Sequence, residues 1–247
     1  MGFFDLHLHI LPGVDDGAGD LDEALDMAGA LVDCGFEGAA VSPHLDSRMF
    51  PNDPEHLREE AGRLAEALAE KRIDLRLLPG AEHFLDAEGL SMLLGGRGIP
   101  VGGTGGVYLV EISMQHPVAT LEQQVFRLRL KGITPIFAHP ERCKSFEDPE
   151  MVRRVVEGGA LLQLDLGSLA GDFGRRPRLI AERLLQEGAY ALAATDLHDA
   201  DQAAKSLPGW IRRLERAAGT EGLEILLSEN PKRLLSGRPC LAVGERP

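Results

Sequence analysis

The most informative part of this sequence lies near its start and reads Phe3-Phe4-Asp5-Leu6-His7-Leu8-His9-Ile10-Leu11-Pro12-Gly13-Val14-Asp15-Asp16-Gly17. Its apolar start and strict alternation predict a β-strand that has Asp5, His7 and His9 on one face. Two imidazoles on one face can hold one metal ion. The two glycine-containing turns that follow bring the Asp16 carboxylate back toward the strand end. Alone, such a histidine pair is more often an ordinary polar pair than a metal site.

Length and composition limit the possible classes of protein. A chain of 247 residues that is 44% hydrophobic can bury a large core, and no linker divides it, so we expect one domain over residues 1–247. The formal charge of −13 argues against nucleic acid or an anionic membrane surface as a partner, because both are themselves negatively charged.

The cysteines and the N-terminus indicate the compartment. Cys34, Cys143 and Cys240 are too few and too scattered for a disulfide framework or a cysteine zinc site. We find neither a signal-peptide pattern nor a stretch long enough for membrane insertion, so we expect a cytoplasmic protein. Cys240 and Arg246 match the Cys-x5-Arg spacing of cysteine phosphatases, but no helix that could bind phosphate follows them.

Strand and helix patterns alternate along the whole chain. After the first strand, we expect strands at residues 38–42, 74–78, 107–112, 134–138, 160–166 and 191–195, and helices at 21–34, 54–71, 87–94, 121–131, 149–157 and 177–187. Asp20 with Glu23, and Thr120 with Gln123, are predicted capping boxes. Seven alternating units in an α/β chain indicate a parallel sheet closed into a barrel.

Candidate metal ligands follow nearly every predicted strand. Parallel barrels build their sites where the carboxyl ends of the strands meet, so we expect these side chains to converge. Imidazole and carboxylate ligands without thiolate suit two or three ions of Mn, Fe or Zn. We expect His56, His83 and His116 at the surface or in supporting positions. The candidate ligands are His7, His9, Asp16, His44, Glu82, Glu111, His139, Asp196 and His198.

Several short motifs together resemble a known family. They are His7-x-His9, Pro12-Gly13-x-Asp15-Asp16-Gly17, Pro43-His44, Gly80-x-Glu82, His139-Pro140-Glu141-Arg142, Asp196-x-His198 and Glu229-Asn230-Pro231. This set resembles the PHP (polymerase and histidinol phosphatase) superfamily. Within it, the chain is most similar to the bacterial manganese-dependent PHP-type protein-tyrosine phosphatases, whose genes accompany capsule and exopolysaccharide tyrosine kinases.

The resemblance implies a distorted (β/α)7 barrel with a trinuclear centre. It assigns His7, His9, Glu82 and Asp196 to the first ion, Glu82, Glu111 and His139 to the second, and Asp16, His44 and His198 to the third. Arg142 matches an arginine that the family uses on the substrate phosphate. One departure is Ala203, where close relatives have a second phosphate-binding arginine. Lys205 lies near enough in sequence to substitute as a point charge.

The implied activity is hydrolysis of phosphotyrosine in a protein, such as a bacterial tyrosine kinase of polysaccharide synthesis, by metal-activated hydroxide. A phenolate leaving group, with a pKa of about 10, needs less protonation than an alkoxide. Two alternatives remain open at this point. One is a small-molecule phosphatase such as histidinol phosphatase, and the other is a metal-binding regulatory protein that has lost turnover.

Overall fold

The computed structural model describes residues 2–243, and its strands form two parallel sheets. The first sheet has the order β1 (Phe3–Leu8), β2 (Phe36–Val41), β4 (Arg76–Leu78). The second has the order β3 (His44–Leu45), β5 (Glu82–Phe84), β6 (Val107–Glu111), β7 (Thr134–Phe137), β8 (Leu161–Asp165), β9 (Leu192–Ala194). Neighbouring strands are parallel throughout both sheets, as the βα alternation predicts.

The two sheets are parts of one curled layer. β2 continues into β3 across Ser42-Pro43, and β4 continues into β5 across residues 79–81, so the strands correspond to the seven predicted ones. A Cβ on Gly80 would lie 2.6 Å from the Val41 carbonyl oxygen, which explains glycine at this break. The His9 amide donates to the Leu197 carbonyl (3.0 Å), which brings β9 back to β1. The predicted distorted (β/α)7 barrel is confirmed.

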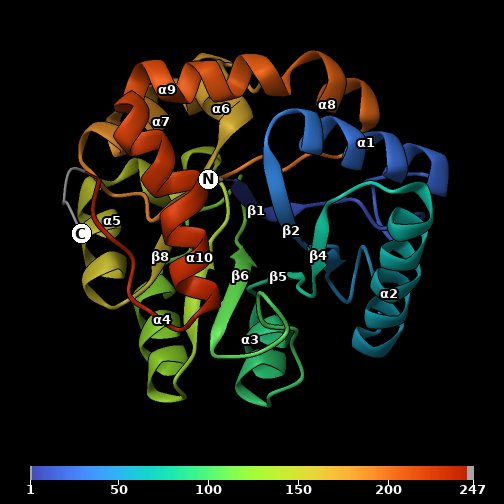
Figure 1. Cartoon of the computed structure of the whole chain (residues 1–247). Helices are drawn as coiled ribbons and strands as arrows, with labels where there is room; N and C mark the ends of the chain where they lie inside the picture. Colours follow the sequence, from blue (N-terminus) through green and yellow to red (C-terminus); the bar gives the residue numbers. More distant parts are fainter. Residues whose placement is uncertain (1, 244–247) are drawn as a thin grey trace.

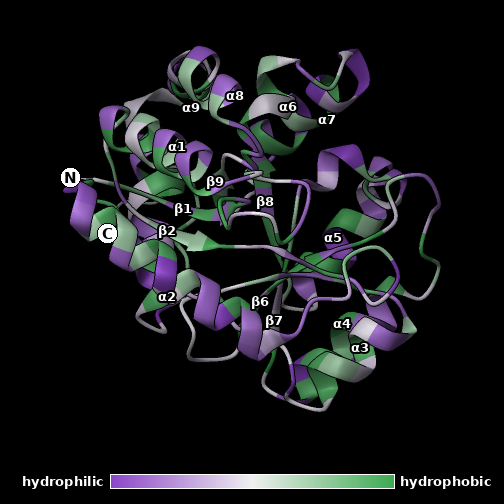
Figure 2. Cartoon of the chain, turned by 90° about the vertical axis from the view of Figure 1, so that its right-hand side faces the viewer, coloured by the Kyte–Doolittle hydropathy of each residue, from purple (hydrophilic) through white to green (hydrophobic). Residues whose placement is uncertain are grey.

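Helices cover the outside of this barrel (Figure 1). They are α1 (Leu21–Asp33), α2 (Pro54–Lys71), α3 (Ala87–Leu94), α4 (Leu121–Leu130), α5 (Pro149–Glu157), α6 (Leu166–Ala170), α7 (Arg175–Gln186), α8 (Ala200–Lys205), α9 (Leu207–Glu224) and α10 (Asn230–Leu235), with short 3₁₀ turns at Pro140–Arg142 and Lys144–Glu147 and a π turn at Ile225–Glu229. Figure 2 shows hydrophobic and hydrophilic residues alternating along the outer helices, as expected for helices that pack one face against the barrel. None of the helices within residues 2–243 is long and apolar enough to cross a bilayer.

Local capping explains where several helices begin. The Asp20 carboxylate accepts a hydrogen bond from the Glu23 amide (2.9 Å), and Asp53 caps α2, whose first residue is Pro54. The predicted capping box at Thr120 is wrong. Its backbone (φ −100°, ψ 15°) is not in the extended region that an N-cap requires, and its side chain makes no capping bond.

One end of the barrel is closed by apolar packing. Leu6, Ile136 and Leu192 form a buried cluster, and Leu234 and Leu235 of α10 pack against it. The polar residues that follow the strands lie at the opposite, open end, where the carboxyl ends of the parallel strands meet.

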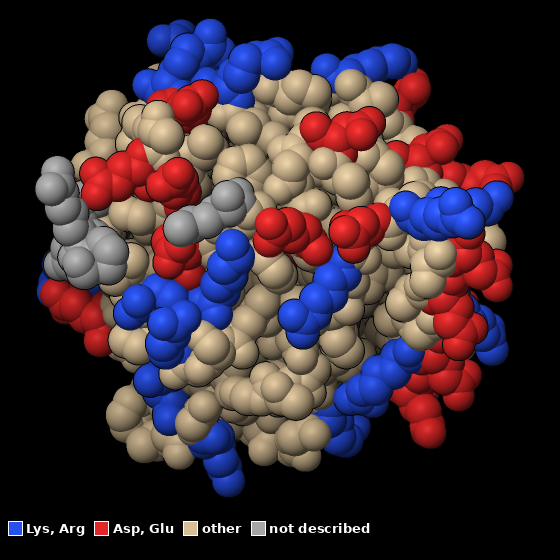
Figure 3. Space-filling view, viewed as in Figure 1, with Lys and Arg blue, Asp and Glu red and all other residues tan. Residues whose placement is uncertain are grey.

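Charge is unevenly spread over the outer helices. Acidic side chains gather on the side of the surface where α1 and α2 lie, to the right in Figure 3, whereas basic side chains lie along the top. The surface is therefore acidic on one side, in keeping with the net charge of −13.

Candidate metal centre

Nine polar side chains from the ends of the strands meet at the open end of the barrel. The sequence predicted each of them as a ligand, and the structure brings all of them into four overlapping groups whose donor atoms lie within 4.8 Å of one another. These groups are His7, Glu82 and His139; His7, His9 and Asp196; His44, Glu82 and Glu111; and His9, Asp16, His44 and His198.

The Glu82 carboxylate lies at the centre of this cluster and is 1% exposed. Its Oε2 lies 3.1 Å from His44 Nδ1, 3.4 Å from His7 Nε2 and 3.5 Å from His9 Nε2. Its Oε1 lies 3.3 Å from His139 Nε2. One buried carboxylate therefore faces four imidazoles that lie on or directly after three different strands, β1, β3 and β7.

Asp196 supplies a second central carboxylate. Its Oδ1 lies 3.0 Å from His7 Nε2 and 3.5 Å from His9 Nε2. Asp196 and His139 both have positive φ, 52° and 32° respectively, a conformation that non-glycine residues adopt only when their surroundings enforce it. The backbone therefore turns sharply after β7 and after β9, and these turns direct the His139 and Asp196 side chains into the cluster.

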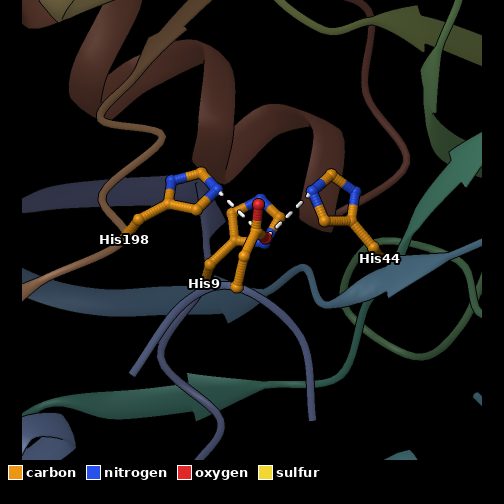
Figure 4. A group of neighbouring side chains, drawn as sticks. His9, His44 and His198 are labelled. Carbon is orange, nitrogen blue, oxygen red and sulfur yellow. Dashed lines mark ion pairs between the residues drawn. The ribbon is translucent and has the colours of Figure 1, made fainter. Parts of the chain in front are cut away.

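The outer part of the cluster is more open. Figure 4 shows the His9, His44 and His198 rings turned toward a common point. Asp16 Oδ1 lies 3.4 Å from His44 Nε2 and 3.7 Å from His198 Nε2, and the Asp16 side chain is 57% exposed. The predicted third ion had three ligands, whereas the structure places His9 beside them as a fourth candidate.

The unpartnered donor atoms indicate that this cluster suits cations. Both Glu82 carboxylate oxygens and His139 Nδ1 are buried without a hydrogen-bond partner among the described residues, and an uncompensated buried carboxylate is costly. Ligands that share an ion at about 2.0–2.2 Å stand roughly 3 to 3.5 Å apart, which is the spacing observed around Glu82. The residues present therefore fit divalent metal ions.

The surroundings raise the pKa values of both His7 and Glu111, for different reasons. Burial alone would lower the pKa of His7, but the Asp196 and Glu82 carboxylates outweigh it and raise the pKa well above its usual range. Burial, reinforced by the charges of Glu82 and Asp196, raises the pKa of Glu111 to about 8. Both shifts reflect the crowding of the Glu82 and Asp196 carboxylates in a region of low solvent access, which favours bound cations.

Two residues that the sequence did not single out hold the predicted ligands in position. Asp15 Oδ2 lies 2.9 Å from His9 Nδ1 and accepts a hydrogen bond from the His44 amide (3.0 Å). Gln163 Oε1 lies 2.8 Å from His7 Nδ1. Each contact leaves Nε2 of the same ring directed at the cluster, as carboxylate and amide partners do in metal sites. Asp15 was visible within the quoted motif, whereas Gln163 lies 156 residues from His7.

Asp5 does not join the cluster. Its carboxylate accepts hydrogen bonds from the amides of His7 (3.1 Å) and Thr195 (3.2 Å) and from the Thr195 hydroxyl (2.5 Å). The pairing of β1 with β2 shifts register between Asp5 and Leu8, which interrupts the simple alternation expected here. Asp5 therefore fixes the two strands that carry His7 and Asp196.

Arg142 borders the cluster on the side of β8. Its Nη1 donates to Asp196 Oδ2 (2.7 Å), lies 3.7 Å from Asp165 Oδ2, and its guanidinium lies 4.2 Å from the centre of the Phe173 ring. The guanidinium is thus restrained by two carboxylates and one aromatic face beside the predicted ligands.

The structure does not bring Lys205 into the cluster. Its ammonium group pairs with Asp201 (2.6 Å), and both side chains are largely exposed. Ala203 is fully buried, so a side chain at this position points into the protein. Among the remaining histidines, His56 is exposed and His83 is buried, with its ring bonded to the backbone of Leu109 and Ile99.

Sequence comparisons place the chain among known proteins. A family model described as "Capsular polysaccharide synthesis, CpsB/CapC" matches residues 3–236. The tyrosine-protein phosphatase YwqE of Bacillus subtilis is 34% identical over 94% of this chain and 91% of its own length. The tyrosine-protein phosphatase CpsB of Streptococcus agalactiae serotype III is 28% identical over 94% of this chain and 97% of its own.

Comparison with solved structures also finds similarity to the YwqE and CpsB phosphatases. A crystal structure from work on YwqE of Bacillus subtilis and CpsB of Streptococcus pneumoniae, described as metal-dependent tyrosine phosphatases, superimposes with a TM-score of 0.89 at 32% identity, covering 99% of this chain and 98% of that one. A lactonase from Listeria monocytogenes shares only the fold, with a TM-score of 0.61 at 14% identity. The chain therefore belongs to the CpsB/CapC family of capsular polysaccharide synthesis.

Proposed function

We propose that this chain is a metal-dependent protein-tyrosine phosphatase that acts on a phosphotyrosine-bearing protein, such as a bacterial tyrosine kinase of polysaccharide synthesis. The observation that carries the proposal is the buried Glu82 carboxylate, which faces four imidazoles without a hydrogen-bond donor of its own. The family and the names of its tyrosine-phosphatase members support the same activity. A cytoplasmic location is part of the proposal, and the three free cysteines suit a reducing compartment.

The proposed ligand assignment is the one that the family resemblance implies. Glu82, Asp196, His7 and His9 would hold one ion, and the last three of these form one observed group. Glu82, Glu111 and His139 would hold a second, with Glu82 grouped with His139 in one observed group and with Glu111 in another. Asp16, His44 and His198, with His9 beside them, would hold a third. We propose manganese, and the imidazole and carboxylate donors also suit iron or zinc. When bound, such ions supply Lewis-acid chemistry, which activates water and neutralises phosphate oxygens.

The chain's own residues then bind and orient the substrate. Arg142 is the one arginine or lysine in contact with the cluster among the described residues, and its guanidinium can form charge-assisted bonds to phosphate oxygens. Asp165 and Phe173 hold this guanidinium from the other side, so little conformational freedom is lost when phosphate binds. Its position suits a role in substrate capture.

The substrate class is tested by a direct comparison. The value of kcat/KM should be higher for a phosphotyrosyl peptide than for histidinol phosphate when both are measured with the same manganese-loaded protein. A preference for histidinol phosphate would retain the metal centre and replace the substrate assignment. Bound metal without turnover of any phosphate ester would instead indicate a regulatory protein.

Replacing Arg142 with alanine should mainly weaken substrate capture. Losing one charge-assisted contact to phosphate costs about 1.5–3 kcal/mol, so we expect KM for a phosphotyrosyl peptide to rise by roughly tenfold to a hundredfold. The expected fall in kcat is smaller. Steady-state kinetics separates the two parameters, and Arg153→Ala, on the exposed face of α5, is the matched control. A fall in kcat at unchanged KM would contradict the assigned role.

A further inference from the structure

A pocket of about 550 Å³ opens directly beside the metal cluster. Asp16, His44 and Glu111 belong to both the pocket wall and the cluster, so a molecule in the pocket can reach the proposed metal ligands without leaving it. The volume lies within the range of about 300–1,000 Å³ that is typical of small-ligand sites.

The rest of the wall is mainly apolar, although it lies at an open surface. Met49, Phe50, Phe84, Ile112 and Met114 line it. Met49 is 73% exposed, an unusual degree for so apolar a side chain. An exposed apolar surface next to a highly charged cluster indicates a ligand with an apolar part joined to a charged part.

The apolar wall is built into the fold. The Phe50 ring stacks on His44 with 5.1 Å between ring centres and 11° between planes. Asp46 and Phe50 exchange two backbone hydrogen bonds (3.2 and 3.0 Å), and Asn52 donates to the carbonyls of Val14 and His44. The turn that carries Phe50 is thus tied to the loop and strand that carry proposed ligands.

On the opposite side, Phe84 is fixed by the sheet. It follows Glu82 by two residues on β5 and pairs with Glu111 of β6. The Arg48 guanidinium lies 5.1 Å from the centre of the Phe84 ring and pairs with Asp46 and Asp86. Because Asp46 and Asp86 together outweigh the charge of Arg48, the pocket mouth carries no net positive charge, and an uncharged ring suits it better than a second anionic group.

We propose that this apolar site, the aryl pocket (Met49, Phe50, Phe84, Ile112 and Met114), binds the phenyl ring of a phosphotyrosyl side chain while its phosphate lies on the metal cluster. The aryl pocket is then the part of the site that selects aryl over alkyl phosphate esters. This inference rests on the proposed phosphatase function and assigns the residues that give it specificity. The substrate ring is buried only while the apolar wall is present. Removing side chains of the wall should therefore weaken the binding of aryl substrates and leave the binding of alkyl substrates unchanged.

The test compares substrates within each variant. Aryl esters are intrinsically more reactive, because phenolate is the better leaving group, so only the change in the aryl-to-alkyl ratio between proteins is informative. We would measure kcat/KM for a phosphotyrosyl peptide, which is an aryl ester, and for glycerol 2-phosphate, which is an alkyl ester. The proteins are manganese-loaded wild type, the double variant Met49→Ala/Met114→Ala, and Phe84→Ala. Phe126→Ala, an exposed phenylalanine of α4 outside the pocket, is the matched control.

We expect the aryl-to-alkyl ratio to fall about tenfold in the double variant and in Phe84→Ala, the amount expected for partial loss of a buried aromatic contact. Phe126→Ala should keep the wild-type ratio. Equal losses on both substrates, or an unchanged ratio, would overturn the aryl pocket. The two methionines are partly exposed, so the double variant should fold even if Phe84→Ala does not.

A binding measurement separates this inference from the proposed function. Calorimetry with phenylphosphonate and methylphosphonate needs no turnover, because neither contains an ester bond. Wild type should bind phenylphosphonate more tightly, and the double variant should lose that preference. Equal binding of the two phosphonates by wild type would reject the aryl pocket even if the protein hydrolyses esters. Absence of hydrolysis with retained phenyl preference would reject the phosphatase function alone.

Discussion

Replacing His139 with alanine is expected to lower the rate of phosphate release from a phosphotyrosyl peptide by about a thousandfold or more, because metal ions contribute several kcal/mol of transition-state stabilisation. His139 Nε2 lies 3.3 Å from Glu82 Oε1 and 3.8 Å from Glu111 Oε1, so its removal leaves two carboxylates as the remaining ligands of the proposed second ion. Metal content measured by mass spectrometry should fall in parallel with activity.

Cys240→Ser is the control for this prediction. Burial raises the pKa of the Cys240 thiol to about 11, which leaves almost no thiolate at neutral pH. The other member of the Cys-x5-Arg spacing, Arg246, lies outside the described residues. The serine variant should therefore keep wild-type activity. Loss of activity in this variant, or full activity in His139→Ala, would overturn the metal mechanism.

Glu82→Gln should be equally damaging, although glutamine has nearly the same shape as glutamate. The substitution removes the buried negative charge of the carboxylate that lies close to all four of the imidazoles of His7, His9, His44 and His139. The amide also replaces one acceptor oxygen with a donor group that cannot bind a cation. We expect metal stoichiometry to fall and activity to drop about a thousandfold or more.

The matched control is Glu157→Gln, since Glu157 is an exposed carboxylate of α5 that pairs, among residues 2–243, with Arg153 alone. It should change neither metal content nor kcat/KM. Circular dichroism and thermal unfolding of Glu82→Gln show whether the fold is retained. A folded Glu82→Gln protein with normal metal content would contradict the central place given to this carboxylate.

Much of the fold follows from local patterns in the sequence. Strand and helix alternation was enough to predict the barrel, and Asp20 and Pro54 mark the starts of α1 and α2 as expected. The capping box at Thr120 failed because a Thr-x-x-Gln spacing says nothing about the backbone angles that a cap needs. The short helix α6 was missed, since Asp165 both ends β8 and caps α6.

The metal-ligating part of the site could be predicted because its residues occur in short sequence motifs at the ends of predicted strands. All nine candidate ligands come together because the parallel topology gathers those ends. Contacts made across the barrel leave no local pattern, and this is why Gln163 beside His7 was not anticipated. Lys205 failed to reach the cluster because helix α8 directs position 205 outward and position 203 inward.

The most direct test of the account is phosphate release from a tyrosine-phosphorylated peptide by protein that has been stripped with a chelator and then reloaded with manganese. The structure has a buried ligand cluster, and burial raises the pKa of the nearby Cys143 thiol, which lies 3.7 Å from the His139 carbonyl oxygen, so this thiol is not an activated nucleophile. Activity should therefore vanish on stripping and return on reloading. Undiminished turnover by the stripped protein, with metal content verified as negligible, would contradict the proposed metal centre.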